Sequence, residues 1–331
     1  MKLFRTLLFI LLLAASAPQT GCDPNGRNVT AGPVPVRRFD RDFYRLLRTD
    51  TPALQQEIAA GYAPLLKVIG KSLFRTDNMQ TSALFERLLN YYAEPALNRL
   101  YRDALIQYED VETVENELGN GFRFLQSRFP EMQIPAVYLH VSGLQQNVIV
   151  ADSLLSLSID KYLGADYPLY RDFFHAGRLR RMERAYVVPD CLTAWLLSEY
   201  PFRGDGRILL ERMIYEGKIK YILYQACPQL IPEMWMGYTP AEYQWCRQNE
   251  KAVWRLMIER KHLYTPDAAT VGRYFSDAPS TFVADGAPGN LGVWIGWQIV
   301  TKYMDRTHVS LENLMNDGDY REILRKSKYK P

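Results

Sequence analysis

The chain has 331 residues, of which 47% are hydrophobic and 23% are charged, a globular composition that excludes bulk disorder. If residues 1–21 are removed as a signal peptide, Lys2 and Arg5 are lost. The remaining chain then has 38 basic residues and 37 acidic ones, a net charge of about +1. A nearly neutral body of this size gives no sign of nucleic-acid binding, and it can bury one large core without disulfide support.

The N-terminal segment has the three-part layout of a secretory signal peptide. Lys2 and Arg5 precede an apolar run over residues 6–15, and small or polar residues follow it. The apolar run is about half as long as the ~20 residues that a membrane-spanning helix needs. We therefore predict a signal peptide over residues 1–21 and no permanent transmembrane helix at this end.

The predicted cleavage site carries a cysteine. Gly21 and Cys22 resemble the end of a bacterial lipobox, in which a peptidase cuts before a cysteine that already carries a diacylglyceryl group, although Gln19 stands where an aliphatic residue is usual. We predict lipidation at Cys22. The alternative is an ordinary signal peptide cut near Ala17, which would leave Cys22 as a free thiol.

Lipidation would attach the protein to a membrane of the bacterial cell envelope. Two or three acyl chains of the palmitate type bind a bilayer strongly, because each buried methylene contributes ~0.8 kcal/mol. Residues 22–37 are rich in Gly, Pro and Asn, a composition typical of a flexible tether. The expected organisation is a signal peptide over 1–21, a lipidated tether over 22–37 and one globular domain over 38–331. The inner or outer membrane, and the leaflet, stay open.

The first part of the body is predicted to be helical. From residue 39 to about residue 110 the apolar residues recur at steps of three and four. Thr51 with Pro52 and the segment 75–77 separate the helices, and Pro64 and Pro95 mark kinks or new starts.

The hydrophobic period changes in the middle of the chain. A helix is predicted over about 111–129, before Pro130, and three short strands follow over 136–141, 147–151 and 155–159. We expect these strands to form a small antiparallel sheet. After residue 172 the pattern returns to helices, so the predicted fold class is α+β, mainly helical.

Three cysteines lie in the second half of the chain. Cys191, Cys227 and Cys246 have no C-x-x-C spacing. We predict buried apolar thiols, and one disulfide stays open because the envelope can be oxidising.

A helix predicted over about 207–223 carries the residues of greatest interest. One stripe at steps of three and four is apolar; it consists of Leu210, Met213, Ile214, Gly217, Tyr221 and Tyr224. Gly217 costs about 1 kcal/mol relative to alanine in a helix, so we expect another backbone to approach it closely. Glu216 borders the stripe and either reaches solvent, pairs with a Lys or Arg, or is held for a ligand.

A second glycine pair lies in a later apolar segment. Gly292 and Gly296 are four residues apart, the spacing that lets helices pack closely. The apolar run 294–300 is too short to span a bilayer. We predict tight packing inside the domain.

Familiar catalytic and metal-binding motifs are absent from the sequence. None of the four histidines has a second histidine four residues away, and no Gly-x-Ser-x-Gly or Walker motif is present. We predict neither a metal nor a cofactor.

Four ordered segments together resemble the GldB family of gliding motility-associated lipoproteins. They are residues 213–218 with Tyr221, residues 237–254, residues 287–300 and residues 327–331. The resemblance covers nearly the whole chain. It implies an envelope lipoprotein linked to gliding and to the associated secretion machinery, with partners among such proteins and no established reaction.

The helix with Glu216 and Gly217 also resembles the one that supplies the third zinc ligand in gluzincin metallopeptidases. In that class a His-Glu-x-x-His helix lies upstream. Its place falls near residues 188–195, which contain no histidine. This resemblance implies a zincin-like fold that lacks its metal site.

These observations predict a lipid-anchored, non-catalytic component of a gliding or secretion-associated envelope assembly. The alternative is an envelope hydrolase, or a glycan- or peptide-binding protein, with a carboxylate-lined cleft. The candidate ligand-binding residues are Asp190, Tyr215, Glu216, Lys218, Tyr221 and Glu250.

Overall fold

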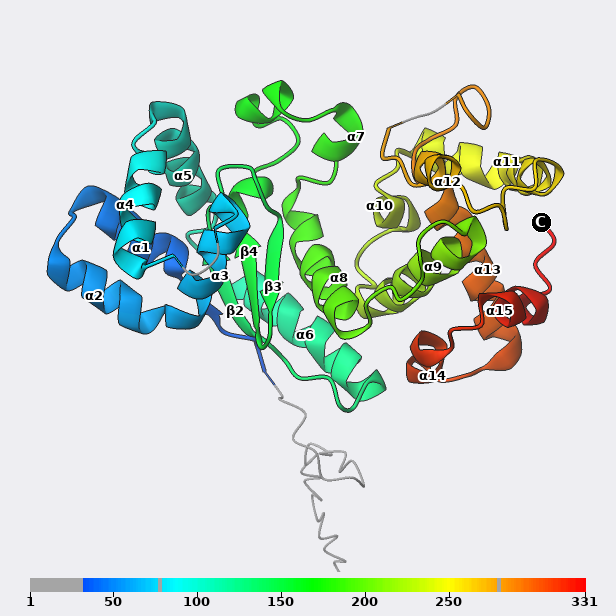
Figure 1. Ribbon diagram of the computed structural model, residues 1–331, viewed down its shortest axis with the longest axis horizontal. Coiled ribbons are helices and arrows are strands. Elements are labelled where there is room, and N and C mark those ends of the chain that lie inside the picture. The colour runs from blue at the N-terminus through cyan, green and yellow to red at the C-terminus, as the bar shows by residue number, and fades with distance from the viewer. Residues whose placement is uncertain (1–31, 77–78, 279–280) are drawn as a thin grey trace, which may run out of the picture.

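A computed structural model describes residues 32–76, 79–278 and 281–331. The predicted signal peptide and Cys22 lie outside the described residues. Helices α1 to α5 lie on one side of a small sheet, and α8 to α15 lie on its other side (Figure 1). The described part is mainly helical, which confirms the predicted α+β class.

The first half of the chain contains helices α1 (Phe39–Arg48), α2 (Pro52–Gly61), α3 (Ala63–Phe74), α4 (Thr81–Tyr92), α5 (Pro95–Gln107) and α6 (Glu112–Arg128), and strands β1 (Val36–Arg37), β2 (Ala136–His140), β3 (Val148–Ala151) and β4 (Leu154–Ser158). The second half contains helices α7 (Ala176–Leu179), α8 (Val187–Glu199), α9 (Leu209–Ala226), α10 (Pro232–Met236), α11 (Pro240–Glu259), α12 (Ala268–Tyr274), α13 (Leu291–Thr307), α14 (Leu311–Asn316) and α15 (Tyr320–Ser327). Three short 3₁₀ helices cover Ile159–Lys161, Pro168–Asp172 and Arg184–Tyr186.

Proline and capping residues set the early helix boundaries as predicted. The Thr51 side chain accepts a hydrogen bond from the Leu54 N–H at the start of α2, and Pro52 occupies the first helical position. Pro95 begins α5 in the same way. Pro64 lies in the first turn of α3, where its missing N–H costs nothing.

The sheet has the strand order β1-β2-β4-β3. Its three predicted strands are confirmed, but the sheet is mixed rather than antiparallel. Only β3 pairs antiparallel with β4, whereas β2 pairs parallel with β4 and β1 parallel with β2. A tight turn at Asp152 reverses the chain between β3 and β4, so β4 runs in the direction of β2. All five residues of β4 are buried, as expected of a strand that is paired on both edges and covered on both faces.

Residues 34–37, which composition places in the tether, pack against the body. Val34 is buried, and its N–H donates to the Glu115 carbonyl at 3.0 Å. The Val36 N–H donates to the Glu115 side chain at 2.8 Å, and Val36 pairs with Val137 in the sheet. The chain is therefore fixed to α6 and β2 before α1 begins.

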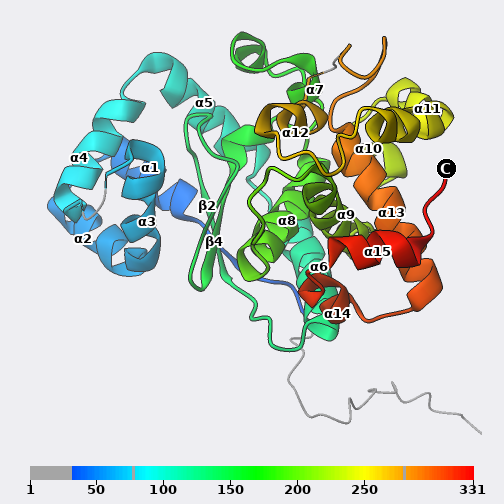
Figure 2. The same ribbon diagram turned by 45° about the vertical axis from the view of Figure 1, so that its right-hand side comes forward.

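Helix α13 crosses α9 at a pair of glycines (Figure 2). A Cβ on Gly217 would overlap the backbone of Gly296, and a Cβ on Gly296 would overlap the Met213 carbonyl. Both expectations of close packing are confirmed. No helix among the described residues is both long enough and apolar enough to cross a bilayer.

The three cysteines of the body are buried and form no disulfide among the described residues. Burial raises the pKa of the Cys191 and Cys246 thiols. The predicted role of Cys191, Cys227 and Cys246 as buried apolar thiols is confirmed.

Candidate functional site

Helix α9 carries four of the six predicted site residues, and it presents them on two faces. Consecutive residues of an α-helix are rotated by about 100°, so a step of two reverses the direction of the side chain. Tyr215 and Lys218 border a pocket on one face. Glu216 lies on another face with Lys220, one turn further along. The structure therefore places Tyr215 and Lys218 in one environment and Glu216 in another.

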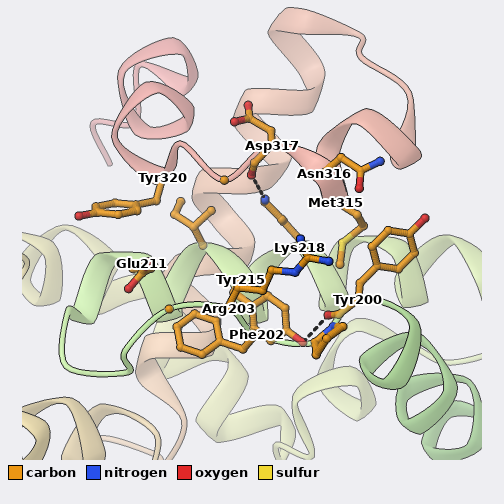
Figure 3. Close-up of a pocket in the computed structure, with 14 residues that line it drawn as sticks. Tyr200, Phe202, Arg203, Glu211, Tyr215, Lys218, Met315, Asn316, Asp317 and Tyr320 are labelled. Carbon is orange, nitrogen blue, oxygen red and sulfur yellow. Dashed lines mark hydrogen bonds between the residues drawn. The ribbon is translucent and has the colours of Figure 1, made fainter.

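The first environment is a pocket of about 370 Å³ between the α8–α9 connection, α9 and the α14–α15 connection (Figure 3). We call it the α9–α14 pocket. Its lining residues are Tyr200, Pro201, Phe202, Arg203, Gly204, Glu211, Ile214, Tyr215, Lys218, Met315, Asn316, Asp317, Gly318 and Tyr320. Segments more than 100 residues apart in the chain thus meet at one place.

Lys218 is the buried cation of this pocket. Its residue is 6% exposed, and its Nζ donates to the Asp317 carbonyl at 2.5 Å (Figure 3). Burial lowers the pKa of Lys218 to about 8, and the negative charge of Asp317 partly offsets this effect. No carboxylate of the described residues lies within 4.0 Å of its Nζ. The ammonium is therefore held by a carbonyl and not by an ion pair.

Tyr215 and the chain before α9 form the opposite wall. The Tyr215 hydroxyl donates to the Tyr200 carbonyl at 2.8 Å, and its ring packs against Phe202 with centroids 5.1 Å apart. Burial raises the pKa of Tyr215 to about 12, and the charge of Glu216 adds to the shift. A Cβ on Gly204 would lie 2.5 Å from the Glu211 Cδ. A larger residue at this position would therefore require the Glu211 side chain to move.

The second environment contains Asp190 and Glu216 around Lys220. Asp190 accepts hydrogen bonds from Arg181 Nη2 at 2.7 Å and from the Tyr162 hydroxyl at 2.9 Å. Lys220 Nζ donates to the Trp235 carbonyl at 2.9 Å. Burial lowers the pKa of Lys220 to about 8, as does the charge of Arg181, whereas the charges of Asp190 and Glu216 act in the opposite direction.

Glu216 has a cation as its nearest charged partner. Its carboxylate lies 3.8 Å from Arg212 Nε, one helical turn away, and both side chains are about a third exposed. Burial raises the pKa of Glu216, and Arg212 and Lys220 oppose the shift. An i,i+4 pair of this exposure contributes only about 0.5 kcal/mol.

Glu250 and Tyr221 lie outside both the α9–α14 pocket and the surroundings of Lys220. Glu250, on α11, accepts a hydrogen bond from the Tyr329 hydroxyl at 2.8 Å and so holds the C-terminal segment. Tyr221 is half-buried, and its pKa is raised by burial and by the charge of Asp305. The six predicted residues are thus spread over separate neighbourhoods, and their binding of a ligand stays a prediction.

Several residues of these two environments were not among the candidate residues predicted from the sequence. Arg203 and Asp317 come from connections between helices, where no periodic pattern marks a site, and Tyr320 is the first residue of α15. Lys220 offered a signal, since a lysine one turn after Glu216 falls on the same helix face.

The residues present do not fit the zinc site that the gluzincin resemblance implies. No group of three His, Cys, Asp or Glu side chains within residues 32–76, 79–278 and 281–331 could hold a metal ion. Residues 188–195, where the resemblance would place the histidine pair, lie in helix α8, which carries Asp190 and no histidine. His140 lies in the core, where its Nδ1 pairs with the Ser156 hydroxyl at 2.8 Å and burial lowers its pKa to about 3.

Comparison with known proteins gives one family. Residues 22–331 match the family model described as "Gliding motility protein GldB". No curated protein and no solved structure matches the chain. The match begins at Cys22 and includes every residue of the α9–α14 pocket. The resemblance to gluzincin metallopeptidases stays a prediction.

Proposed function

The chain belongs to the GldB gliding motility family, and from this premise we propose that it is a lipid-anchored cell-envelope protein that acts as a non-catalytic component of a gliding or secretion-associated assembly. The observation that carries the proposal is the family match from Cys22 to the last residue. A family whose shared sequence begins at the predicted lipidated cysteine is best explained by a mature protein that begins there.

The predicted anchor would hold the body close to the membrane. Cys22 and Gly32 are separated by ten residue steps, which span at most about 36 Å when fully extended. Residues 32–36 lie at the lower edge of the molecule in Figure 1, and α7 lies at the upper edge. We propose that the lower edge faces the bilayer and that partners bind the sides and the upper edge.

The carboxylates support a non-catalytic role. Asp190 pairs with Arg181, Glu216 lies beside Arg212, and Glu250 accepts from Tyr329. A general acid or base must reach the reacting atoms of a substrate, whereas each of these three carboxylates lies beside a cation or a hydroxyl of the protein itself. The alternative of a ligand-binding envelope protein is favoured by a different feature, the α9–α14 pocket.

The experiment that tests the proposal is a Cys22→Ala substitution in the full chain. We expect the variant to fold and to leave the membrane fraction almost completely, because the acyl chains supply the binding free energy. Fractionation after a high-salt wash measures this, and Cys246→Ala is the matched control, expected to stay with the membrane. Sedimentation of the Cys22→Ala variant with washed membranes would show that the anchor lies elsewhere.

The Cys22→Ala variant also distinguishes a non-catalytic component of an envelope assembly from an envelope enzyme. A component of an envelope assembly is expected to lose its effect once released, so Cys22→Ala should fail to complement a deletion strain. An envelope enzyme would retain turnover as a soluble domain. Full complementation by a released, folded protein would contradict the proposed role.

A further inference from the structure

The α9–α14 pocket contains a buried charge that the fold does not neutralise. An ammonium group has three donors, and the only acceptor of Lys218 Nζ among the described residues is the Asp317 carbonyl. The residue is 6% exposed and forms no ion pair within the described part of the chain. Burial of such a group destabilises a folded protein. Arrangements of this kind are concentrated at functional sites.

The mouth of the pocket carries a second free cation. Arg203 is exposed and forms no ion pair among the described residues. The segment that carries it is fixed closely against α9, since Gly204 packs on Glu211 and Phe202 packs on Tyr215. Lys218 and Arg203 therefore both line the pocket, and Arg203 belongs to a segment that packs tightly against α9.

The remaining lining selects among anions. Glu211 lines the pocket, and the Asp317 carboxylate, which accepts hydrogen bonds from the Asp319 N–H and the Tyr303 hydroxyl, adds negative charge close to Lys218. These charges disfavour a dianion such as a phosphate ester. Phe202, Ile214 and Met315 provide apolar surface. A ligand with one negative charge, an apolar group and N–H donors matches all three features, and a volume of about 370 Å³ lies within the range of small-ligand sites.

We propose that the α9–α14 pocket binds the free C-terminal carboxylate of a peptide whose last side chain is apolar. Lys218 and Arg203 pair with the carboxylate, Phe202 and Met315 contact the side chain, and Glu211 accepts a hydrogen bond from a peptide N–H. The interaction is non-covalent capture of a chain end, a recognised mode of peptide binding. It goes beyond the envelope role and does not depend on the lipid anchor.

The protonation of Lys218 adds a second readout. Its pKa of about 8 means that Lys218 in the free pocket loses its charge as the pH rises through this value, and a bound carboxylate favours the charged form. The other charged or titratable groups that line the pocket are Tyr200, Arg203, Glu211, Tyr215, Asp317 and Tyr320. Tyr215 stays neutral in this range because its pKa is raised to about 12. Binding is therefore expected to weaken progressively above about pH 8.

The test uses the full mature chain in detergent and a synthetic probe, N-acetyl-alanyl-leucine, as the free acid and as the C-terminal amide. Calorimetric titration at pH 7 is expected to show at least about tenfold tighter binding of the acid, the size expected for a hydrogen bond to a charged group. Lys218→Met is expected to abolish this preference. Lys251→Met, an exposed lysine on α11 outside the pocket, is the control and is expected to keep it.

Folding is checked on the same samples. Lys218→Met removes a buried, unneutralised ammonium and keeps apolar volume, so its melting temperature is expected to be equal or higher. If that variant does not fold, Arg203→Gln at the exposed mouth replaces it, with an expected loss of about threefold or more in acid affinity. Equal affinity for acid and amide in the native protein, or no binding of either up to about 10 mM, would overturn the proposal. So would unchanged acid binding in both variants. None of these outcomes bears on Cys22.

Discussion

Replacement of Gly296 by alanine is expected to prevent stable folding, or to lower the free energy of unfolding by about 3 kcal/mol or more. A Cβ at this position would overlap the carbonyl oxygen of Met213 on α9. The obstacle is backbone and not the end of a flexible side chain, so the two helices must move apart. The residues of α9 and α13 beside this contact, such as Met213 and Ile295, are buried in the core, and separation of the two helices would open voids along both of them.

Soluble yield and thermal unfolding measure this effect. Gly272→Ala is the matched control, because Gly272 also lies inside a helix, α12, and no atom outside its own helix lies within 4 Å of the added Cβ. The control is expected to be neutral or to stabilise by up to about 1 kcal/mol. A Gly296→Ala protein that melts at the native temperature would contradict the proposed helix contact.

Replacement of Asp160 by alanine is expected to lower the free energy of unfolding by about 3 kcal/mol or more. The Asp160 carboxylate is fully buried and accepts hydrogen bonds from the Ser142 N–H at 2.9 Å, from the Leu144 N–H at 2.7 Å and from the Ser158 hydroxyl. Truncation leaves these donors without an acceptor, and each unsatisfied buried donor costs about 1–3 kcal/mol. Leu144 also has a positive φ, so its loop depends on these bonds.

Urea unfolding measures the loss. Asp160→Asn keeps the shape and one acceptor oxygen, so a smaller loss is expected. Asp166→Ala is the control: Asp166 is fully exposed, its only ion pair among the described residues is with Arg171 at 3.4 Å, and a change within about 0.5 kcal/mol is expected. Equal stability of the Asp160→Ala and Asp166→Ala proteins would show that the loop does not depend on the carboxylate.

Periodicity and proline predicted most of the helical architecture. The helices expected over 111–129 and 207–223 are observed at Glu112–Arg128 and Leu209–Ala226. The sequence predicts that Gly217 contacts another backbone, because a glycine inside a helix is destabilising unless the missing side chain allows a close approach. Its partner Gly296 could not be identified, because a sequence pattern shows that a close approach is needed but not which segment makes it.

Sheet pairing and the pocket depended on contacts that no local pattern contains. Three strands placed in the order of the chain would form the predicted antiparallel sheet, but β4 lies between β2 and β3 and therefore pairs parallel with β2. The α9–α14 pocket joins residues 200–204 to residues 315–320. Lys218 and Tyr215 were identifiable on α9, whereas Arg203 and Asp317 lie in polar connections without periodicity.

Mass spectrometry of the N-terminal peptide of the protein purified from membranes tests directly whether Cys22 carries a lipid anchor. We expect the peptide to begin at Cys22 and to carry the added mass of a diacylglyceryl group, with or without a third acyl chain on the amino group. A peptide that begins near Ala17, or a Cys22 that carries no lipid, would contradict this expectation.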